Sequence, residues 1–202
     1  MRIYIIIASV LLLCGCADRQ VYDAACDALK DASQRDGCYQ EKGIVFGDSA
    51  FCERIVGPDF RDRCFFRLAI DNSRPKLCRE IVKENDANHC YALTTRNDSF
   101  CAHVDLQDRR DKCYYDVGVA GKTESCAMVS DAFFRDNCYA RYVYATGDQA
   151  PCEKIENERR KKECYYTLAE RQGLSEPAAC DMIPEEYREG CRNRTIDASA
   201  EI

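Results

Sequence analysis

The feature that most constrains this chain is a series of cysteines that recur in pairs at a fixed spacing. Fourteen of the sixteen cysteines form seven pairs, with eleven residues between the two members in six pairs and ten in the last. We number the repeats 1 to 7 by these pairs: Cys26/Cys38, Cys52/Cys64, Cys78/Cys90, Cys101/Cys113, Cys126/Cys138, Cys152/Cys164 and Cys180/Cys191. A period of roughly 26 residues is typical of proteins built by stacking one supersecondary unit.

Other residues keep fixed positions relative to the cysteines. An aliphatic residue stands three positions after each first cysteine: Leu29, Ile55, Ile81, Val104, Val129, Ile155 and Ile183. The residue after each second cysteine is aromatic except in repeat 7: Tyr39, Phe65, Tyr91, Tyr114, Tyr139, Tyr165 and then Arg192. An Arg-Asp pair ends two residues before the second cysteine in four repeats: Arg35-Asp36, Arg61-Asp62, Arg110-Asp111 and Arg135-Asp136. These matches to one template indicate an internal repeat.

Each repeat is predicted to form two helices. Residues that favour helix N-termini, such as Asp48 and Asn97, precede the first cysteine. A break such as Gly57-Pro58 or Ser130 then separates this short helix from a second one, which carries the second cysteine and the aromatic residue. The sequence therefore predicts an all-α, solenoid-like array of about seven αα-hairpin repeats.

The two cysteines of each repeat are predicted to form a disulfide. They lie on either side of the hairpin turn, where two Cα atoms come within the roughly 5.5 Å that a disulfide requires. Bridges between adjacent repeats, such as Cys38 to Cys52, are the alternative, but the spacing between repeats varies. A unit of about 26 residues is too small to fold on a hydrophobic core alone. In the chain-entropy model each closed loop is worth about 3 kcal/mol.

The N-terminus has the pattern of a secretion signal. Arg2 precedes an apolar run at residues 3–13, which is shorter than the about 20 residues of a transmembrane helix. The alternative, a buried N-terminal helix, lacks a flanking cap. Leu13-Cys14-Gly15-Cys16 resembles the lipobox of prokaryotic lipoproteins. This resemblance implies cleavage after Gly15 and acyl chains, palmitate among them, on Cys16, enough to anchor a protein stably.

Export has consequences for location and for the domain plan. An extracytoplasmic chain meets an oxidising environment in which disulfides persist. Ala17 is not the Asp that retains some Gram-negative lipoproteins at the inner membrane, so the resemblance implies the periplasmic face of an outer membrane for such a source. The expected domains are a signal peptide (1–15), a lipidated tether (16–22), a seven-repeat helical domain (23–192) and a polar tail (193–202).

Charge and motifs exclude several function classes. A net charge of −6 argues against binding to nucleic acid and against electrostatic adhesion to anionic lipids. No zinc-type or Cys-x-x-Cys spacing follows Cys16, so neither a metal nor another cofactor is expected. His89 and His103 occupy repeat positions that are polar and variable elsewhere. The Arg-Asp pairs are expected to form surface and inter-repeat ion pairs, with a charged binding ladder as the alternative.

Three aromatic doublets provide candidate contact residues. The second member of each doublet, Phe66, Tyr115 or Tyr166, is expected to be exposed and to contact a partner. The sequence thus favours a non-catalytic, membrane-anchored module that binds an unidentified protein or peptide, or serves as a structural spacer. The alternative is an extracytoplasmic hydrolase that acts on cell-envelope material, with acidic residues or His103 in a groove between repeats.

Overall fold

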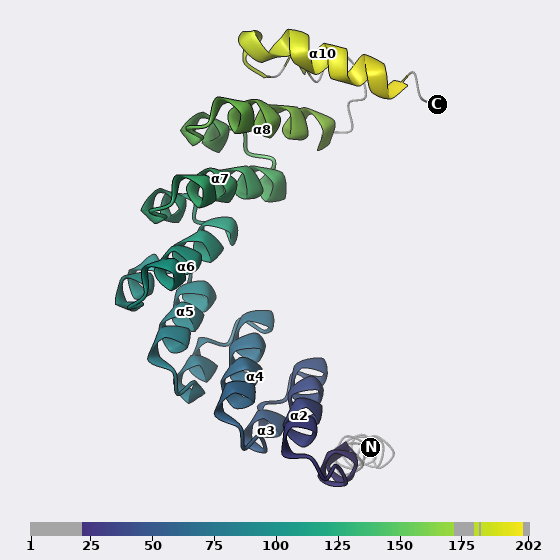
Figure 1. Ribbon diagram of the computed structural model, residues 1–202, viewed down its shortest axis with the longest axis vertical. Helices are drawn as coiled ribbons and strands as arrows, with labels where there is room; N and C mark the ends of the chain where they lie inside the picture. Colours follow the sequence, from purple (N-terminus) through teal and green to yellow (C-terminus); the bar gives the residue numbers. More distant parts are fainter. Residues whose placement is uncertain (1–21, 172–179, 182, 200–202) are drawn as a thin grey trace, which may run out of the picture. The chain divides into compact units, whose positions relative to one another are not determined.

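A computed structural model describes residues 22–171, 180–181 and 183–199 of the chain (Figure 1). Every regular element in these ranges is a helix, which confirms the predicted all-α fold class. The chain divides into two compact units, Met1–Thr95 and Arg96–Ile202, which contain repeats 1–3 and repeats 4–7. The predicted signal peptide and the predicted lipidation site, Cys16, lie outside the described residues. None of the described helices has the length and apolar character needed to cross a membrane.

Each of repeats 1–6 pairs a short helical segment with a longer α-helix (Figure 1). After a helix at residues 22–27, the first unit contains α2 (Ala32–Phe46), α3 (Ser49–Glu53), α4 (Pro58–Asp71), η1 (Pro75–Glu80) and α5 (Glu84–Thr95). The second unit contains η2 (Asp98–His103), α6 (Gln107–Val119), η3 (Thr123–Met128), α7 (Ala132–Thr146), η4 (Ala150–Lys154), α8 (Glu158–Arg171) and α10 (Glu185–Ser199). The short segments of repeats 3–6 are 3-10 helices, a form that is common in pieces of this length. Residues 193–199, expected as a polar tail, continue α10.

Seven disulfides join the short segment of each repeat to its own long helix. The two Cα atoms of each bridge are 5.6 to 5.8 Å apart. Every bridge lies within one repeat, and none joins neighbouring repeats as Cys38 to Cys52 would. The bonded pairs are Cys26–Cys38, Cys52–Cys64, Cys78–Cys90, Cys101–Cys113, Cys126–Cys138, Cys152–Cys164 and Cys180–Cys191. So many bridges indicate that the protein matures in an oxidising, extracytoplasmic environment.

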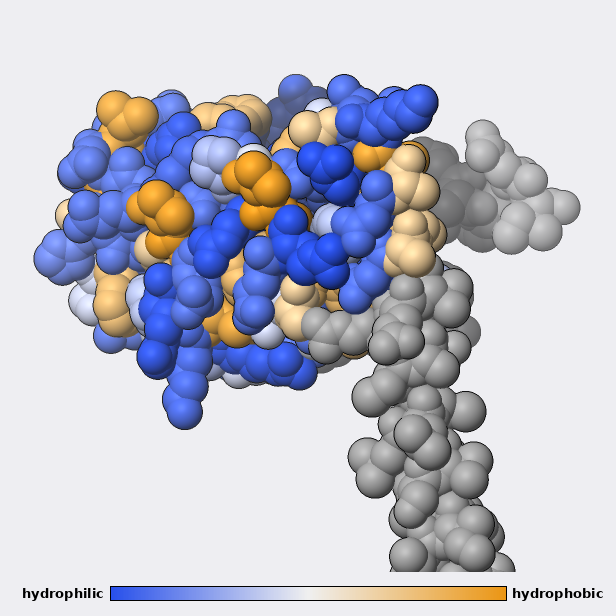
Figure 2. All heavy atoms as spheres, turned by 90° about the horizontal axis from the view of Figure 1, so that it is seen from below, coloured by the Kyte–Doolittle hydropathy of each residue, from blue (hydrophilic) through white to orange (hydrophobic). Residues whose placement is uncertain are grey.

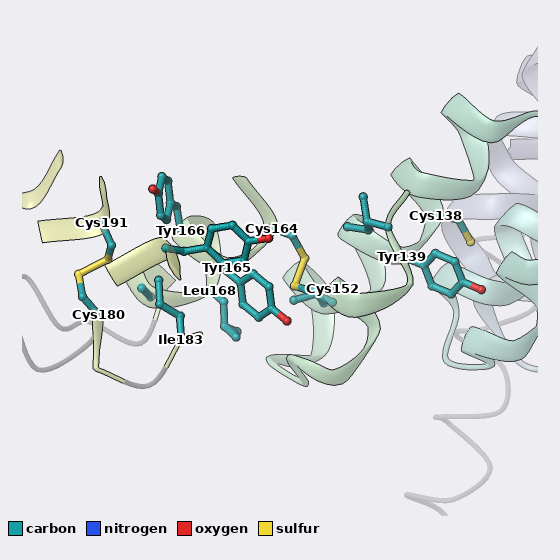
Figure 3. Close-up of a cluster of buried hydrophobic side chains, with 14 of the residues drawn as sticks. Cys138, Tyr139, Cys152, Cys164, Tyr165, Tyr166, Leu168, Cys180, Ile183 and Cys191 are labelled. Atoms are coloured by element: carbon teal, nitrogen blue, oxygen red, sulfur yellow. A yellow bond between two sulfur atoms is a disulfide. The ribbon is translucent and has the colours of Figure 1, made fainter. Parts of the chain in front are cut away.

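The recurring apolar residues and the sulfur atoms together form the core of each unit. The aliphatic residue after the first cysteine is at most 6% exposed in repeats 2–7. In the second unit Tyr139, Tyr165 and Ile183 pack in one cluster with the disulfides of repeats 5–7 (Figure 3). Tyr39 and Phe65 occupy the same place in the first unit. The bridges are therefore part of the buried interior.

The residues that follow the two cysteines also meet across the hairpin. The Tyr39 hydroxyl donates to Asp27 at 2.7 Å, and burial together with this bond raises the pKa of Tyr39 to about 12. Tyr165 donates to Glu153 in the same way. In repeat 7, where arginine replaces the aromatic residue, Arg192 pairs with Asp181 at 2.5 Å. The arginine thus keeps the contact although it breaks the aromatic pattern.

The aspartate of each Arg-Asp pair links its repeat to the next one. These four aspartates are at most 8% exposed: Asp36, Asp62, Asp111 and Asp136. The carboxyl oxygens accept hydrogen bonds, at 2.7 to 3.4 Å, from the two backbone N–H groups that follow the buried aliphatic residue of the next repeat. Those N–H groups stand at the start of the next long helix, where a helix has no partners of its own for them. We call this contact the aspartate clamp.

The expectation that the Arg-Asp pairs form ion pairs is therefore wrong for the aspartates. Their carboxyl oxygens accept hydrogen bonds from backbone N–H groups of the next repeat and do not pair with a cation of the described residues. The arginines also bond mainly to backbone carbonyls, as Arg110 Nε does to Val104 O at 2.8 Å. An inter-repeat ion pair of the expected kind joins Arg135 to the exposed Glu156 at 2.8 Å. At this exposure such a pair is worth under about 1 kcal/mol.

Two glycines let a disulfide approach the preceding long helix closely. A Cβ atom on Gly43 would lie 2.9 Å from Cys64 Sγ, and one on Gly118 would lie 2.6 Å from the Sγ atoms of both Cys126 and Cys138. Because a buried disulfide cannot swing aside as a flexible side chain does, a methyl group at Gly118 forces the helix and the next repeat apart.

We expect Gly118→Ala to lower the free energy of unfolding by about 1–3 kcal/mol through overpacking. Gly37→Ala is the matched control, because its Cβ would meet only Phe60 at 3.9 Å. Within helix α2 this control is expected to raise stability by roughly 0.5–1 kcal/mol. Urea unfolding followed by circular dichroism measures both, and equal effects of the two substitutions would contradict the close contact.

On the face that Figure 2 shows, hydrophilic residues predominate and apolar residues form separate patches. The exposed large apolar side chains of the described residues are Val45, Phe46, Val56, Val82, Leu106, Met128, Phe133, Phe134 and Tyr144. Isolated apolar residues are normal on protein surfaces. Three of these, however, belong to one helix, α7.

Candidate functional site

The second aromatic residue of each doublet faces the next repeat. It stands two positions after the second cysteine. In repeats 2 and 4 the clamp aspartate, Asp62 or Asp111, stands four positions before it, whereas repeat 6 has Lys162 there. Residues four apart share one face of a helix, so Phe66 and Tyr115 lie on the clamp face of their helices. The neighbouring repeat decides how accessible each doublet residue is.

Phe66 lies against α5, and His89 covers part of its ring. The two rings meet edge to face with centroids 5.4 Å apart, and Phe66 is half-buried against the core of the first unit. His89, on α5, is thus part of a packing contact.

Tyr166 is buried, so the expectation of an exposed contact residue is not met at this position. It is only 6% exposed and belongs to the core cluster of the second unit (Figure 3). Gly190 of α10 makes this possible, because a Cβ at that position would overlap the Tyr166 hydroxyl. A small residue on the next helix therefore lets α10 close over the ring.

Tyr115 lines an open groove between α6 and α7. The groove has a volume of about 600 Å³, and eight residues line it: Gln107, Asp108, Asp111, Lys112, Tyr115, Asp131, Phe134 and Asn137. Tyr115 is half-buried against the core, whereas Phe134 is 53% exposed. Two rings from consecutive repeats thus give this groove an apolar lining that remains open to solvent.

Three aspartates line the groove beside the two rings, and one of them, Asp111, is fully used in hydrogen bonds that hold the fold. Asp111 accepts hydrogen bonds from the Ser130 hydroxyl at 2.5 Å, from Gln107 at 2.8 Å and from two backbone N–H groups. Burial by itself raises the pKa of Asp111, but these bonds outweigh it, so the pKa lies below its ordinary value. Asp111 is therefore an ionised clamp and not a proton donor at neutral pH.

Two further carboxylates remain exposed at the groove. Asp108 lies in the first turn of α6. Asp131 is the N-cap of α7 and accepts a hydrogen bond from Phe134 N at 3.0 Å. The sequence placed this cap one residue earlier, at Ser130, whose hydroxyl instead bonds to Asp111. The only lysine that lines the groove, Lys112, is paired with Asp116 at 2.7 Å.

A second groove, of about 410 Å³, lies on the other side of α7, against α8. Phe133 and Tyr144 line it, and they are 56% and 62% exposed. The Arg160 guanidinium lies over the Phe133 ring, 3.6 Å from its centroid, and donates to Phe133 O at 2.9 Å. A cation of the chain itself thus covers this aromatic ring.

Sequence reasoning missed Phe133 and Phe134, although a signal for them existed. They stand five and four positions before the second cysteine, where most other repeats carry polar or charged pairs: Ser33-Gln34, Asn85-Asp86, Asp108-Arg109 and Arg159-Arg160. The position five before the second cysteine is polar or charged in every repeat except repeat 5, whereas the position four before it is also aromatic in repeats 2 and 7, as Phe60 and Tyr187. The adjacent aromatic pair Phe133-Phe134 is therefore a local departure of repeat 5 from the template.

The paired cysteines hold the fold and offer no thiol to either groove. Cys90, inside α5, and Cys113, inside α6, are 0% exposed, and each is bonded within its own repeat. Neither of them lines a groove. Cys164 borders the groove between α7 and α8, but its sulfur is bonded to Cys152. These predicted site residues are therefore structural and are not positioned to contact a ligand.

The other candidate groups do not gather at these grooves. His103 lines neither of them. Within the described part of the chain, no group of three or more His, Cys, Asp or Glu side chains is placed to hold a metal ion. Comparison with known proteins adds no relative, because no protein-family model, no curated protein and no solved structure matches the chain.

Proposed function

We propose that this protein is a non-catalytic scaffold, held on the extracytoplasmic side of a membrane by lipid on Cys16, which binds a protein or peptide partner. One observation carries the proposal: Tyr115 and Phe134, from consecutive repeats, line an open groove of about 600 Å³ between α6 and α7. Aromatic residues are enriched in protein interfaces, and repeat arrays offer extended surfaces to their partners.

The membrane anchor has separate support. Residues 13–16 resemble a lipobox, and the seven disulfides fit a protein that is exported before it folds. The anchor would keep the repeats at the membrane surface, where a partner meets them. In a Gram-negative source, Ala17 favours the periplasmic face of the outer membrane.

Photo-crosslinking in intact cells tests the binding function. With benzoylphenylalanine at Phe134 of the anchored protein, we expect irradiation to give a discrete crosslinked product with another protein. The matched control is the same amino acid at Val82, which is also exposed but does not line the groove. Identical products from both positions, or none from Phe134, would contradict a contact surface at the groove.

Lipid labelling and cell fractionation in the same cells test the membrane anchor. We expect Cys16→Ser to abolish incorporation of an alkynyl palmitate analogue and to release the protein from the membrane fraction. Cys14→Ser is the control and is expected to stay labelled, because Cys14 leaves with the signal peptide. If the Cys16→Ser protein were labelled as strongly as the unsubstituted protein, the lipid anchor would be refuted, and the proposed binding at the groove would be unaffected.

A further inference from the structure

The groove between α6 and α7 lacks a cation that the neighbouring groove contains. In the groove between α7 and α8, Phe133 of repeat 5 meets Arg160 of repeat 6, and the guanidinium covers the ring. These two residues stand five and four positions before the second cysteines of their repeats. The same two positions in the groove between α6 and α7 are held by Asp108 and Phe134. One groove therefore contains an aromatic ring and a cation, and the other an aromatic ring and a carboxylate.

The uncompensated charge of the open groove is negative. Lys112 is neutralised by Asp116, and Asp111 is surrounded by hydrogen-bond donors of the fold. Asp108 and Asp131 remain, and among the described residues no cation forms an ion pair with either of them. The N-termini of α6 and α7 favour anions, but Asp108 in the first turn of α6 and Asp131 at the N-cap of α7 already provide a negative charge there. A ligand of this groove is therefore expected to bring positive charge.

We propose that the groove binds an arginine side chain, flanked by apolar residues, of a peptide segment of the partner. The guanidinium would lie over Phe134 as Arg160 lies over Phe133, and would face Asp108 and Asp131. A flat cation on an aromatic face next to a carboxylate gains from both contacts. The flanking apolar side chains would cover the ring of Tyr115. This inference rests on the proposed function and specifies the partner's chemistry.

Fluorescence anisotropy with a defined probe tests the inference. The probe is the fluorescein-labelled peptide Gly-Ser-Leu-Arg-Leu-Arg-Leu-Ser-Gly, titrated with the full mature chain in detergent. The same peptide with citrulline at both arginine positions keeps the shape, but it loses the charge and has a carbonyl oxygen in place of one guanidinium NH₂ donor. We expect the citrulline peptide to bind about tenfold more weakly, or worse. Equal affinity of the two peptides would overturn the inference.

Substitutions in the protein test whether the peptide binds at the groove between α6 and α7. Phe134→Ser is expected to weaken binding about tenfold, and Asp108→Asn about threefold to fivefold. Asp108→Asn changes an exposed side chain and leaves the fold intact, which circular dichroism checks for both variants. Tyr144→Ser in the other groove and Asp71→Asn on α4 are controls, each expected to change affinity by less than about twofold. Phe133 is not used as a control, because its ring packs edge to face on the Phe134 ring. If the controls weaken binding as much as Phe134→Ser does, the peptide binds elsewhere and the inference is wrong.

The outcome is distinguishable from a failure of the proposed function. A crosslinked partner at Phe134 together with equal binding of the arginine and citrulline peptides would retain the scaffold function and reject the arginine. A crosslinked product that consists of two copies of this chain would likewise reject a peptide partner. Binding of the arginine peptide without any crosslinked partner in cells would support the chemistry of the groove and reject the scaffold function.

Discussion

Reduction of all seven disulfides is expected to unfold the protein at neutral pH and 25 °C. Each bridge closes a short loop and contributes about 3 kcal/mol in the chain-entropy model, whereas a whole domain is stable by only about 5–15 kcal/mol. Circular dichroism at 222 nm, before and after treatment with a phosphine reductant, measures the loss of helix. A count of free thiols at each point relates that loss to the number of opened bridges.

The physical reason lies in what fills the interior. The cysteines are 5% exposed or less in every repeat except at the half-buried Cys38. The sulfur atoms therefore occupy space that larger apolar side chains would fill in an ordinary helical repeat. Opened bridges would leave paired thiols in helices too short to be stable alone in water.

Two controls make this prediction sharp. Oxidised protein in the same buffer should keep its helical signal over the same period. The double substitution Cys180→Ser with Cys191→Ser removes only the bridge of repeat 7, so repeats 1–6 are expected to stay folded. Full helicity and an unchanged melting temperature with all thiols free would show that packing alone holds the fold.

The hairpins and their bridges could be predicted because one template recurs along the whole chain. A fixed spacing within pairs, beside a variable spacing between them, distinguishes a loop closed within a repeat from a connection between repeats. The buried aliphatic and first aromatic positions follow from the same alignment. These are local properties, which a linear pattern records well.

The contacts between repeats could be predicted only in part. Each residue of an α-helix turns by about 100°, so a side chain two positions from the second cysteine points away from the bridge. This argument places the clamp aspartates and the second doublet residues on the face toward the next repeat. It does not show that backbone N–H groups, and not a cation, meet the aspartates there. That outcome depends on where the next turn lies in space.

The accessibility of each second doublet residue depends on what the following repeat places against it. The position just before the second cysteine is His89 opposite Phe66, Gly190 opposite Tyr166 and Asn137 beside Tyr115. The histidine packs on its ring and the glycine lets a helix close over its ring. Only a three-dimensional arrangement shows that the groove at Tyr115 stays open while Tyr166 is buried, since both belong to Tyr-Tyr doublets.

Asp136→Ala is expected to lower the free energy of unfolding by about 2–4 kcal/mol, a large effect for a polar residue. The Asp136 carboxyl, 3% exposed, accepts hydrogen bonds from Glu156 N and Asn157 N, each at 3.0 Å. Alanine leaves both donors at the start of α8 without their partner and opens a small cavity between repeats 5 and 6. Thermal unfolding followed by circular dichroism should show a melting temperature lower by roughly 5–12 °C.

Two companion variants test whether the clamp geometry, and not charge in general, is responsible. Asp71→Ala removes an exposed carboxylate that is paired with Arg67 at 3.7 Å, and is expected to cost under about 1 kcal/mol. Asp136→Asn keeps the shape but turns an amide N–H₂ toward one of the two N–H donors, so an intermediate loss is expected. A loss from Asp136→Ala no greater than that from Asp71→Ala would mean that the aspartate clamp does not hold consecutive repeats together.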